Sequence, residues 1–255
     1  MIRKLRVFDL SSIVSNDYVK IWKFQKTLAE NLNKNRILGK VSDCLLLVQH
    51  QSVYTFGRGA TLDNIKVNPS TINDKLYRIE RGGEVTWHGP GQLVAYPIFD
   101  LYNHKKDLHC YTSSLEESVI KTLNSFSITG ERNNINTGIW IGNNKICAIG
   151  VSASRWITYH GLSLNVTCNL NYYNAIIPCG ISNPTFGVTN MIKHNISNSL
   201  EINMVSNHLV KSIAEVFNFN ECEVLSYTDS ISELEMILNE DKVSNELSLA
   251  ELLKT

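Results

Sequence analysis

The most informative stretch of this 255-residue sequence reads Arg81-Gly-Gly-Glu-Val-Thr-Trp-His88-Gly-Pro-Gly-Gln92. Five of these residues are glycine or proline, so the stretch fits neither a regular helix nor a central strand. Glycines let a backbone approach a ligand closely, and four side chains add polar groups around it: Arg81, Thr86, His88 and Gln92. The apolar run from Leu93 to Ile98 predicts a strand that anchors the loop to the core. The alternative is a surface turn that happens to carry polar side chains. Attachment of the loop to the core through the predicted strand favours a binding loop.

Outward from this loop, helical and strand-like patterns are mixed along the chain. Apolar residues at helical spacing predict helices over residues 17–33, 112–126 and 205–217. Short apolar runs predict strands at 5–10, 44–48, 93–98, 139–141, 145–151 and 162–166. Gly142-Asn143-Asn144 suits a hairpin turn, and residues 169–187 are punctuated by proline and glycine. The pattern predicts one mixed α/β (α+β) domain.

Composition excludes several classes of protein. Hydrophobic residues make up 43% and charged residues 19%, which is ordinary for a globular protein, and the formal net charge is zero. Basic residues are dispersed, so we expect no nucleic-acid partner, and the apolar runs are too short to span a membrane. Six cysteines without a CxxC pair indicate a reducing compartment and no zinc site. Met1 is followed almost at once by a strand-like run, with no secretory signal pattern.

Three further segments carry reactive side chains. Lys145-Ile-Cys-Ala-Ile-Gly150 begins a strand with a lysine, which after a turn usually faces water. His160-Gly-Leu-Ser-Leu-Asn-Val166 offers a histidine that is either a base or structural. Pro178-Cys179-Gly180 places a thiol on a loop, and such a thiol becomes a nucleophile only beside a cation, a base or a helix N-terminus. None of these segments alone settles a function.

Together the four segments resemble the lipoyl(octanoyl) transferase family of lipoate biosynthesis. They match its RGGxxTxHGPGQ loop, its KIxxIG and HGLxLNV strands and its PCG loop, in that order. The resemblance runs from about Tyr54 to Gly180, roughly half of the chain. It implies a single mixed α/β domain of the type found in the catalytic domains of biotin and lipoate protein ligases. We expect this domain over residues 1–228, followed by an extension of unknown role over 229–255.

The resemblance also implies roles for individual residues. Cys179 is the acyl-thioester nucleophile, and Lys145 lowers its pKa and transfers protons. The implied substrate-binding residues are Arg81, Gly82, Gly83, Glu84, Val85, Thr86, Trp87, His88, Ala148, Ile149, Gly150, Gly161, Leu162 and Ser163. We expect glycines 82, 83, 150 and 161 to leave room for an eight-carbon chain. Whether His88 and His160 act in catalysis or in structure stays open. No cofactor and no metal are implied.

The implied reaction transfers an octanoyl group from octanoyl-acyl carrier protein to a specific lysine of a lipoyl domain. The acceptors are the lipoyl domains of 2-oxoacid dehydrogenase complexes and the glycine cleavage H protein. The bacterial cytoplasm is the simplest location, with a plastid or mitochondrial matrix as the alternative if a transit peptide has been removed. Two other functions remain possible: an ATP-dependent lipoate or biotin ligase of the same fold, and an inactive relative that only binds carriers. Retention of both Cys179 and Lys145 favours the transferase.

Overall fold

Nine strands in the described part of the chain form one central sheet. The computed structural model describes residues 3–14, 17–37, 42–67, 74–134, 136–178, 185–195 and 199–241. Eight strands follow one another across the sheet in the order β12 (Glu221–Leu225), β1 (Lys4–Leu10), β2 (Asp43–Val48), β6 (Gln92–Ile98), β10 (Ile157–Asn165), β9 (Asn144–Ser154), β8 (Gly138–Ile141) and β7 (Glu131–Arg132). The ninth, β11 (Gly187–Val188), pairs in parallel with β9 outside this order.

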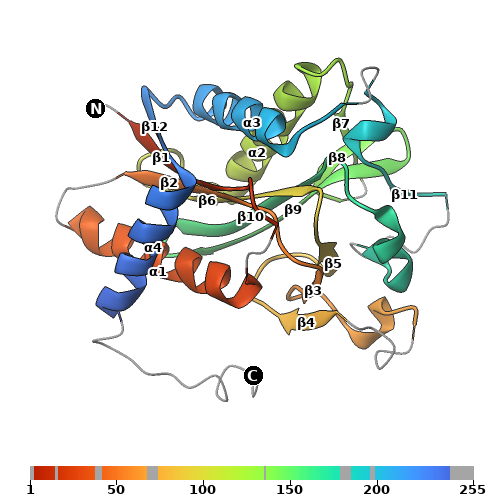
Figure 1. Ribbon diagram of the computed structural model, residues 1–255, viewed down its shortest axis with the longest axis horizontal. Helices are drawn as coiled ribbons and strands as arrows, with labels where there is room; N and C mark the ends of the chain where they lie inside the picture. The colour runs from red at the N-terminus through yellow and green to blue at the C-terminus, as the bar shows by residue number, and fades with distance from the viewer. Residues whose placement is uncertain are drawn as a thin grey trace.

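Four α-helices cover the two faces of this sheet (Figure 1). On one face lie α1 (Tyr18–Ile37) and α4 (Tyr227–Asp241), and on the other lie α2 (Leu108–Asn124) and α3 (Ile202–Val216). Strands β12, β1 and β2 are parallel, whereas the neighbours from β2 through to β7 are antiparallel. The sequence prediction of a mixed α/β arrangement is therefore confirmed.

A second, smaller sheet lies beside the central one. It consists of β3 (Val53–Phe56) between β4 (Lys75–Arg78) and β5 (Val85–His88). The described residues also form three short 3-10 helices: η1 (Leu62–Asn64), η3 (Leu170–Ala175) and η5 (Met191–Lys193). The buried side of the small sheet packs on η3, with Trp87 and Tyr173 in one apolar cluster. The small sheet therefore has its own core and can hold the glycine-rich segment firmly.

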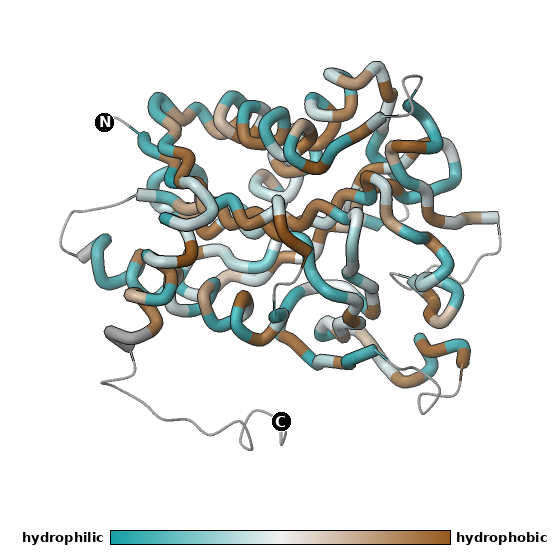
Figure 2. The backbone as a smooth tube through the Cα atoms, viewed as in Figure 1, coloured by the Kyte–Doolittle hydropathy of each residue, from teal (hydrophilic) through white to brown (hydrophobic). Residues whose placement is uncertain are grey.

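Strand alternation explains how the central sheet buries both faces. In β2, Leu45 and Leu47 belong to the core beneath α2 and α3, whereas Leu46 and Val48 belong to the core beneath α1 and α4. Successive side chains of a strand point to opposite faces, so a continuous apolar run is required when both faces are covered. Figure 2 shows the hydrophobic segments gathered along this sheet and on the helix faces that meet it.

Local signals in the sequence account for most of the element boundaries. The carboxylate of Asp17 accepts a hydrogen bond from Val19 N at the start of α1, as a capping residue does. Gly142 adopts a φ of 55° in the predicted turn between β8 and β9. Asp107, which the pattern did not single out, caps α2 by accepting from Cys110 N at 3.0 Å, so that helix begins four residues before the predicted position 112.

Residues 229–241, part of the segment expected to be an extension, form most of α4. Leu234 is completely buried in the core beneath α1 and α4. Lys20 of α1 forms an ion pair with Glu235 at 2.7 Å. This helix therefore covers a part of the central sheet that would otherwise be open to water.

We predict that α4 contributes to the stability of the whole domain. Leu234→Ala should lower the free energy of unfolding by about 2–5 kcal/mol, because it leaves a cavity in the core. Met236 lies on the same helix and is 64% exposed, so Met236→Ala should change stability by no more than about 0.5 kcal/mol. Urea denaturation of both variants measures the difference. Equal stability of the two variants would show that α4 is not docked on the sheet.

Candidate functional site

The glycine-rich segment is docked between the two sheets by backbone contacts. Gly82 N donates a hydrogen bond to Val151 O of β9 at 2.9 Å, and Arg58 N donates to Arg81 O at 3.0 Å. A side-chain carbon at position 150 would lie only 2.8 Å from Gly82 O. Glycine at 150 therefore lets the loop reach β9.

The glycines of the strands allow close backbone packing. A side-chain carbon at position 161 would lie 2.1 Å from Ala95 O of the adjacent strand β6. Both Gly150 and Gly161 also line the cleft described below, and that they leave room there for an acyl chain stays a prediction. Their role is to allow the close backbone packing that forms the walls of the site.

Arg81 braces the glycine-rich segment against the small sheet. Its Nη2 donates to Thr55 O at 2.6 Å and to Thr55 Oγ1 at 2.9 Å, and its Nη1 donates to Gly82 O at 3.0 Å. The side chain is buried, so these bonds replace its contacts with water. Arg81 thereby fixes the relative position of β3 and the loop.

A cleft lies between the docked loop and the α1 face of the central sheet. From the predicted substrate-binding set it is lined by Arg81, Gly82, Gly83, Glu84, Thr86, His88, Ala148, Ile149, Gly150, Gly161, Leu162 and Ser163. The structure thus brings together three segments that lie far apart in the sequence. Its cavity volume is only about 50 Å³, so the cleft is narrow.

Two residues of the predicted set lie outside the cleft. Along β5, Thr86 and His88 line it, whereas Val85 and Trp87 point into the core of the small sheet. The ring of Trp87 stacks on Tyr172 at a centroid distance of 4.7 Å, and its Nε1 donates to Ser52 Oγ at 2.8 Å. Strand alternation separates these four neighbours, which a contiguous motif does not reveal.

Four residues that the sequence analysis did not assign to the site also line the cleft: Tyr18, Val94, Tyr96 and His160. Tyr18 begins α1, and Val94 and Tyr96 share one face of β6. The strand pattern predicts that Val94 and Tyr96 lie on the same side, but no local signal says that this side faces a cleft. His160 was left without a role, and the structure makes it part of the wall.

The polar wall of the cleft contains buried, neutral histidines. Burial lowers the pKa of His88 to about 3. Burial also lowers the pKa of His50 well below its usual value, and the ring of His50 lies 5.8 Å from that of His88, outside the cleft lining. Burial also lowers the pKa of His160, whose Nε2 lies 3.9 Å from Glu80 Oε2. His160 adopts a φ of 57° and its backbone N–H donates to Gln25 Oε1 at 2.9 Å.

Lys145 points inward, contrary to the usual behaviour of a lysine after a turn. Its side chain is buried, with the residue only 4% exposed. Nζ donates to Thr137 O at 3.1 Å and to Asn136 Oδ1, and it lies 5.1 Å from the ring centroid of Trp140. Hydrogen bonds and an aromatic face thus hold the amine in a defined place.

Cys179 and Gly180 lie outside the described residues. On the N-terminal side of Cys179, Ile177 N donates to Asn64 O at 2.7 Å. On the C-terminal side of Cys179, Val188 of β11 pairs with Lys145 of β9, and Thr189 N donates to Lys145 O at 3.0 Å. The described chain therefore returns to Lys145 nine residues after Cys179.

Four of the other thiols differ from an activated nucleophile. Burial raises the pKa of both Cys44 and Cys168 to about 12, and burial also raises the pKa of Cys222. Cys147 is completely buried in the main core. A thiol that stays protonated at neutral pH is a poor nucleophile.

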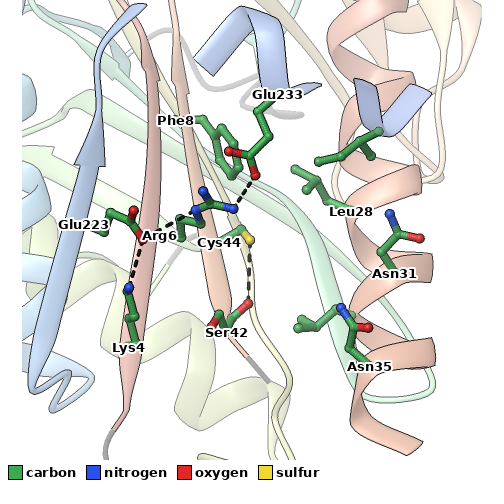
Figure 3. A pocket seen from close by; sticks show the side chains of 12 residues that line it. Lys4, Arg6, Phe8, Leu28, Asn31, Asn35, Ser42, Cys44, Glu223 and Glu233 are labelled. Carbon is green, nitrogen blue, oxygen red and sulfur yellow. Dashed lines mark hydrogen bonds and ion pairs between the residues drawn. The ribbon is translucent and has the colours of Figure 1, made fainter. Parts of the chain in front are cut away.

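A larger groove lies at the other end of the α1 face, between α1, α4 and the strands β12, β1 and β2 (Figure 3). The cavity volume of this groove is about 670 Å³. Its charged groups already neutralise one another, since Lys4 pairs with Glu223 at 2.9 Å and Arg6 pairs with Glu233. None of the four motifs contributes to it, so we assign the site to the narrow cleft despite its smaller volume.

Two further observations concern the described ranges. They contain no group of three or more histidine, cysteine, aspartate or glutamate side chains placed to hold a metal ion. None of their helices combines the length and the apolar character needed to traverse a lipid bilayer.

The chain is similar to known octanoyltransferases. Residues 17–214 match the model of the lipoyl protein ligase A/B catalytic domain. A chloroplastic octanoyltransferase of Arabidopsis thaliana is 44% identical over 226 residues, which cover 84% of this chain and 79% of the relative. An octanoyltransferase of Flavobacterium johnsoniae is 37% identical over 232 residues, covering 85% of this chain and 98% of the relative.

Solved structures show the same fold. A lipoate-protein ligase A bound with ATP superposes with a TM-score of 0.68 at 15% identity, over 96% of this chain and 97% of the ligase. A bipartite lipoate protein ligase from Thermoplasma acidophilum gives a TM-score of 0.68 at 14% identity, over 96% of this chain and 93% of that protein. The predicted fold class is therefore confirmed.

The buried histidines make a prediction about stability and pH. The unfolded chain binds protons below about pH 6.5 that the folded cleft does not bind until far lower pH. The stability that depends on keeping these histidines neutral should therefore be fully present above this pH. As the pH drops below it, the free energy of unfolding should fall by up to about 1.4 kcal/mol per pH unit for each such histidine. His88→Gln should flatten the slope between pH 7 and pH 5, measured by urea denaturation.

Exposed His109 on α2 provides the matched control. The slope of His109→Gln should equal that of the wild type. An unchanged slope in His88→Gln would mean that His88 is not held neutral in the folded protein.

Proposed function

The chain belongs to the octanoyltransferases of the lipoyl protein ligase A/B family and is an acyltransferase that acts in protein lipoylation. From this premise we propose that it transfers octanoyl from octanoyl-acyl carrier protein to a specific lysine of lipoyl domains, through a thioester on Cys179. The observation that carries the proposal is the buried, hydrogen-bonded amine of Lys145 beside the strand that follows the Cys179 segment.

The first step moves the acyl group onto the enzyme. The Cys179 thiolate attacks the carbonyl carbon of the donor thioester, and the bond to the carrier sulfur breaks. The Lys145 ammonium gives its proton to the departing carrier thiolate. The products are octanoyl-Cys179, a carrier thiol and a neutral Lys145.

The second step moves the acyl group to the acceptor. The amine of the lipoyl-domain lysine attacks the thioester carbonyl, the new C–N bond forms, and Cys179 leaves as a thiolate. The neutral Lys145 takes the proton that the attacking nitrogen loses. Thiolate and ammonium are then restored together, so no external acid, base or energy source is consumed.

The cleft suits the acyl chain of this substrate. Ala148 of β9 and Val94 of β6 are apolar residues that line this narrow slot. Each buried methylene contributes about 0.8 kcal/mol, so an eight-carbon chain gains most of its binding from this wall. Loop docking through Gly82 and bracing through Arg81 keep the slot narrow.

An ATP-dependent ligase of the same fold is the alternative. The likeness to ATP-bound ligase A is a likeness of fold at 15% identity. A ligase activates a free acid as an adenylate, so it has no need of a nucleophilic cysteine. The Pro178-Cys179-Gly180 motif together with the inward Lys145 supports the transferase.

The acceptors we propose are the lipoyl domains of 2-oxoacid dehydrogenase complexes and the glycine cleavage H protein. One similar relative is chloroplastic and others are bacterial. We accordingly propose a plastid or the bacterial cytoplasm as the location.

The proposed intermediate predicts a covalent adduct on one cysteine. Incubation with octanoyl-carrier protein should add one octanoyl group to the wild type, and peptide mapping should place it on Cys179. Cys179→Ala should lose both the adduct and more than about 99% of transfer, because no other thiol replaces the nucleophile. Intact-mass spectrometry and an assay of octanoyl-lipoyl domain measure the two effects.

Cys222→Ala is the control, since Cys222 is an exposed thiol on β12 far along the sheet from β9. It should keep the adduct and full activity. Full transfer by Cys179→Ala would refute the covalent mechanism.

A further inference from the structure

Two motif residues without an assigned role, Gln92 and Asn165, meet inside the protein. Gln92 begins β6 and Asn165 ends β10, and the two are direct neighbours in the antiparallel register. Both are buried, at 0% and 3% exposure. Gln92 Nε2 donates to Asn165 Oδ1 at 2.9 Å. A buried amide pair of this kind is costly unless each polar atom finds a partner.

The partners fix the orientation of the Gln92 amide. Nε2 lies 3.2 Å from Trp87 O, and a carbonyl oxygen accepts but never donates, so this atom must be the nitrogen. Oε1 then faces His88 Nδ1 at 2.8 Å. Because Oε1 only accepts, neutral His88 carries its proton on Nδ1. Gln92 thereby ties the histidine of the glycine-rich loop to Asn165.

The other end of Asn165 reaches the strand beside Lys145. Asn165 Nδ2 donates to Thr189 O at 2.9 Å, and Thr189 N donates to Lys145 O at 3.0 Å. Thr189 is 4% exposed, so its carbonyl has little access to water. One side chain thus connects the loop that docks on β9 with the backbone at Lys145.

This connection matters because β11 is short. It pairs with β9 at two positions only, Gly187 with Asn144 and Val188 with Lys145. Two pairs give a weak hold on a strand end, so buried side-chain bonds add to the constraint: Asn165 donates to Thr189 O, and Asn190 Nδ2 donates to Cys168 O at 3.0 Å. Loss of the Asn165 donor would leave the Thr189 carbonyl without this partner.

We propose that Asn165 is a positioning residue for the acyl transfer. It holds the Thr189 backbone against β9, and so keeps Lys145 in register with the chain that follows the nucleophile segment. It also couples that register to the glycine-rich loop through Gln92 and His88. This role rests on the proposed function of Lys145 and Cys179, but the contact that it requires is independent of that function.

The test compares Asn165→Ala and Asn165→Asp with wild type. The aspartate keeps the size and the acceptor of the side chain, and when ionised it lacks the donor to Thr189 O. Amide exchange at Thr189 should accelerate in both variants, as measured by hydrogen–deuterium exchange. The kcat for octanoyl transfer should fall about 10- to 100-fold, because small misplacements of reacting groups are costly. KM for octanoyl-carrier protein should change less than about threefold.

A second readout follows the thiol. The pH midpoint of Cys179 alkylation, mapped by peptide mass spectrometry, should rise in both variants. Lys145→Met, which removes the positive charge that favours the thiolate, should raise the same midpoint. A merely structural defect lowers the amount of folded protein and does not move this midpoint.

Thr158→Val is the matched control. Thr158 lies on the same strand, is completely buried, and its Oγ1 donates to Pro97 O at 3.0 Å. This variant should lose comparable stability but keep the wild-type kcat and alkylation midpoint.

Unchanged Thr189 exchange in the Asn165 variants would overturn the proposal, as would accelerated exchange with wild-type kcat and alkylation midpoint. If the wild type itself shows no Cys179-dependent transfer, the proposed function fails and the positioning role fails with it. Amide exchange at Thr189 then still reports whether the hydrogen bond from Asn165 to Thr189 O holds this backbone in place.

Discussion

The contact between the glycine-rich loop and β9 is the constraint on which the site depends. Gly82 N meets Val151 O at 2.9 Å, and this approach requires that position 150 carry no side chain. The small sheet has its own core and is joined to the central sheet beside the cleft by this docking. A cleft walled by both sheets exists only while the loop stays in place. Its width is therefore set by backbone contacts, which vary less than side-chain rotamers.

The wall that this docking creates is unusual because it is both buried and polar. One continuous set of hydrogen bonds runs from Arg81 at one end to Thr189 at the other, through Thr55, His88, Gln92 and Asn165. Such a network is costly to desolvate, and it holds its members in one arrangement once all are paired. The histidines remain neutral, so the acyl chain meets no full charge from them. The positive charge of the proposed mechanism is confined to Lys145, behind Thr137 and Trp140.

Much of this arrangement could be predicted from the sequence. The apolar runs and helical spacings placed most elements, since both depend on local periodicity. The motifs identified most of the cleft wall, because glycine and polar residues at fixed spacing leave a recognisable pattern. Three features of the site were not predicted from the sequence. Trp87 points away from the cleft because strand alternation acts within the motif, and Tyr18 enters it only through the packing of α1. Glycines 150 and 161 were expected to leave room for a ligand, and the close approach of neighbouring backbone at both positions could not be foreseen because it depends on which strands become neighbours.

The central claim is that the energy for amide formation comes from the donor thioester and not from ATP. The most direct measurement supplies octanoyl-carrier protein and an apo lipoyl domain in the presence of EDTA, without nucleotide, and follows octanoyl-amide by mass spectrometry. A thioester-driven transferase should give rapid transfer under these conditions, and neither product nor pyrophosphate from free octanoate with ATP and Mg²⁺. Transfer from the free acid that requires ATP, with none from the thioester, would contradict it.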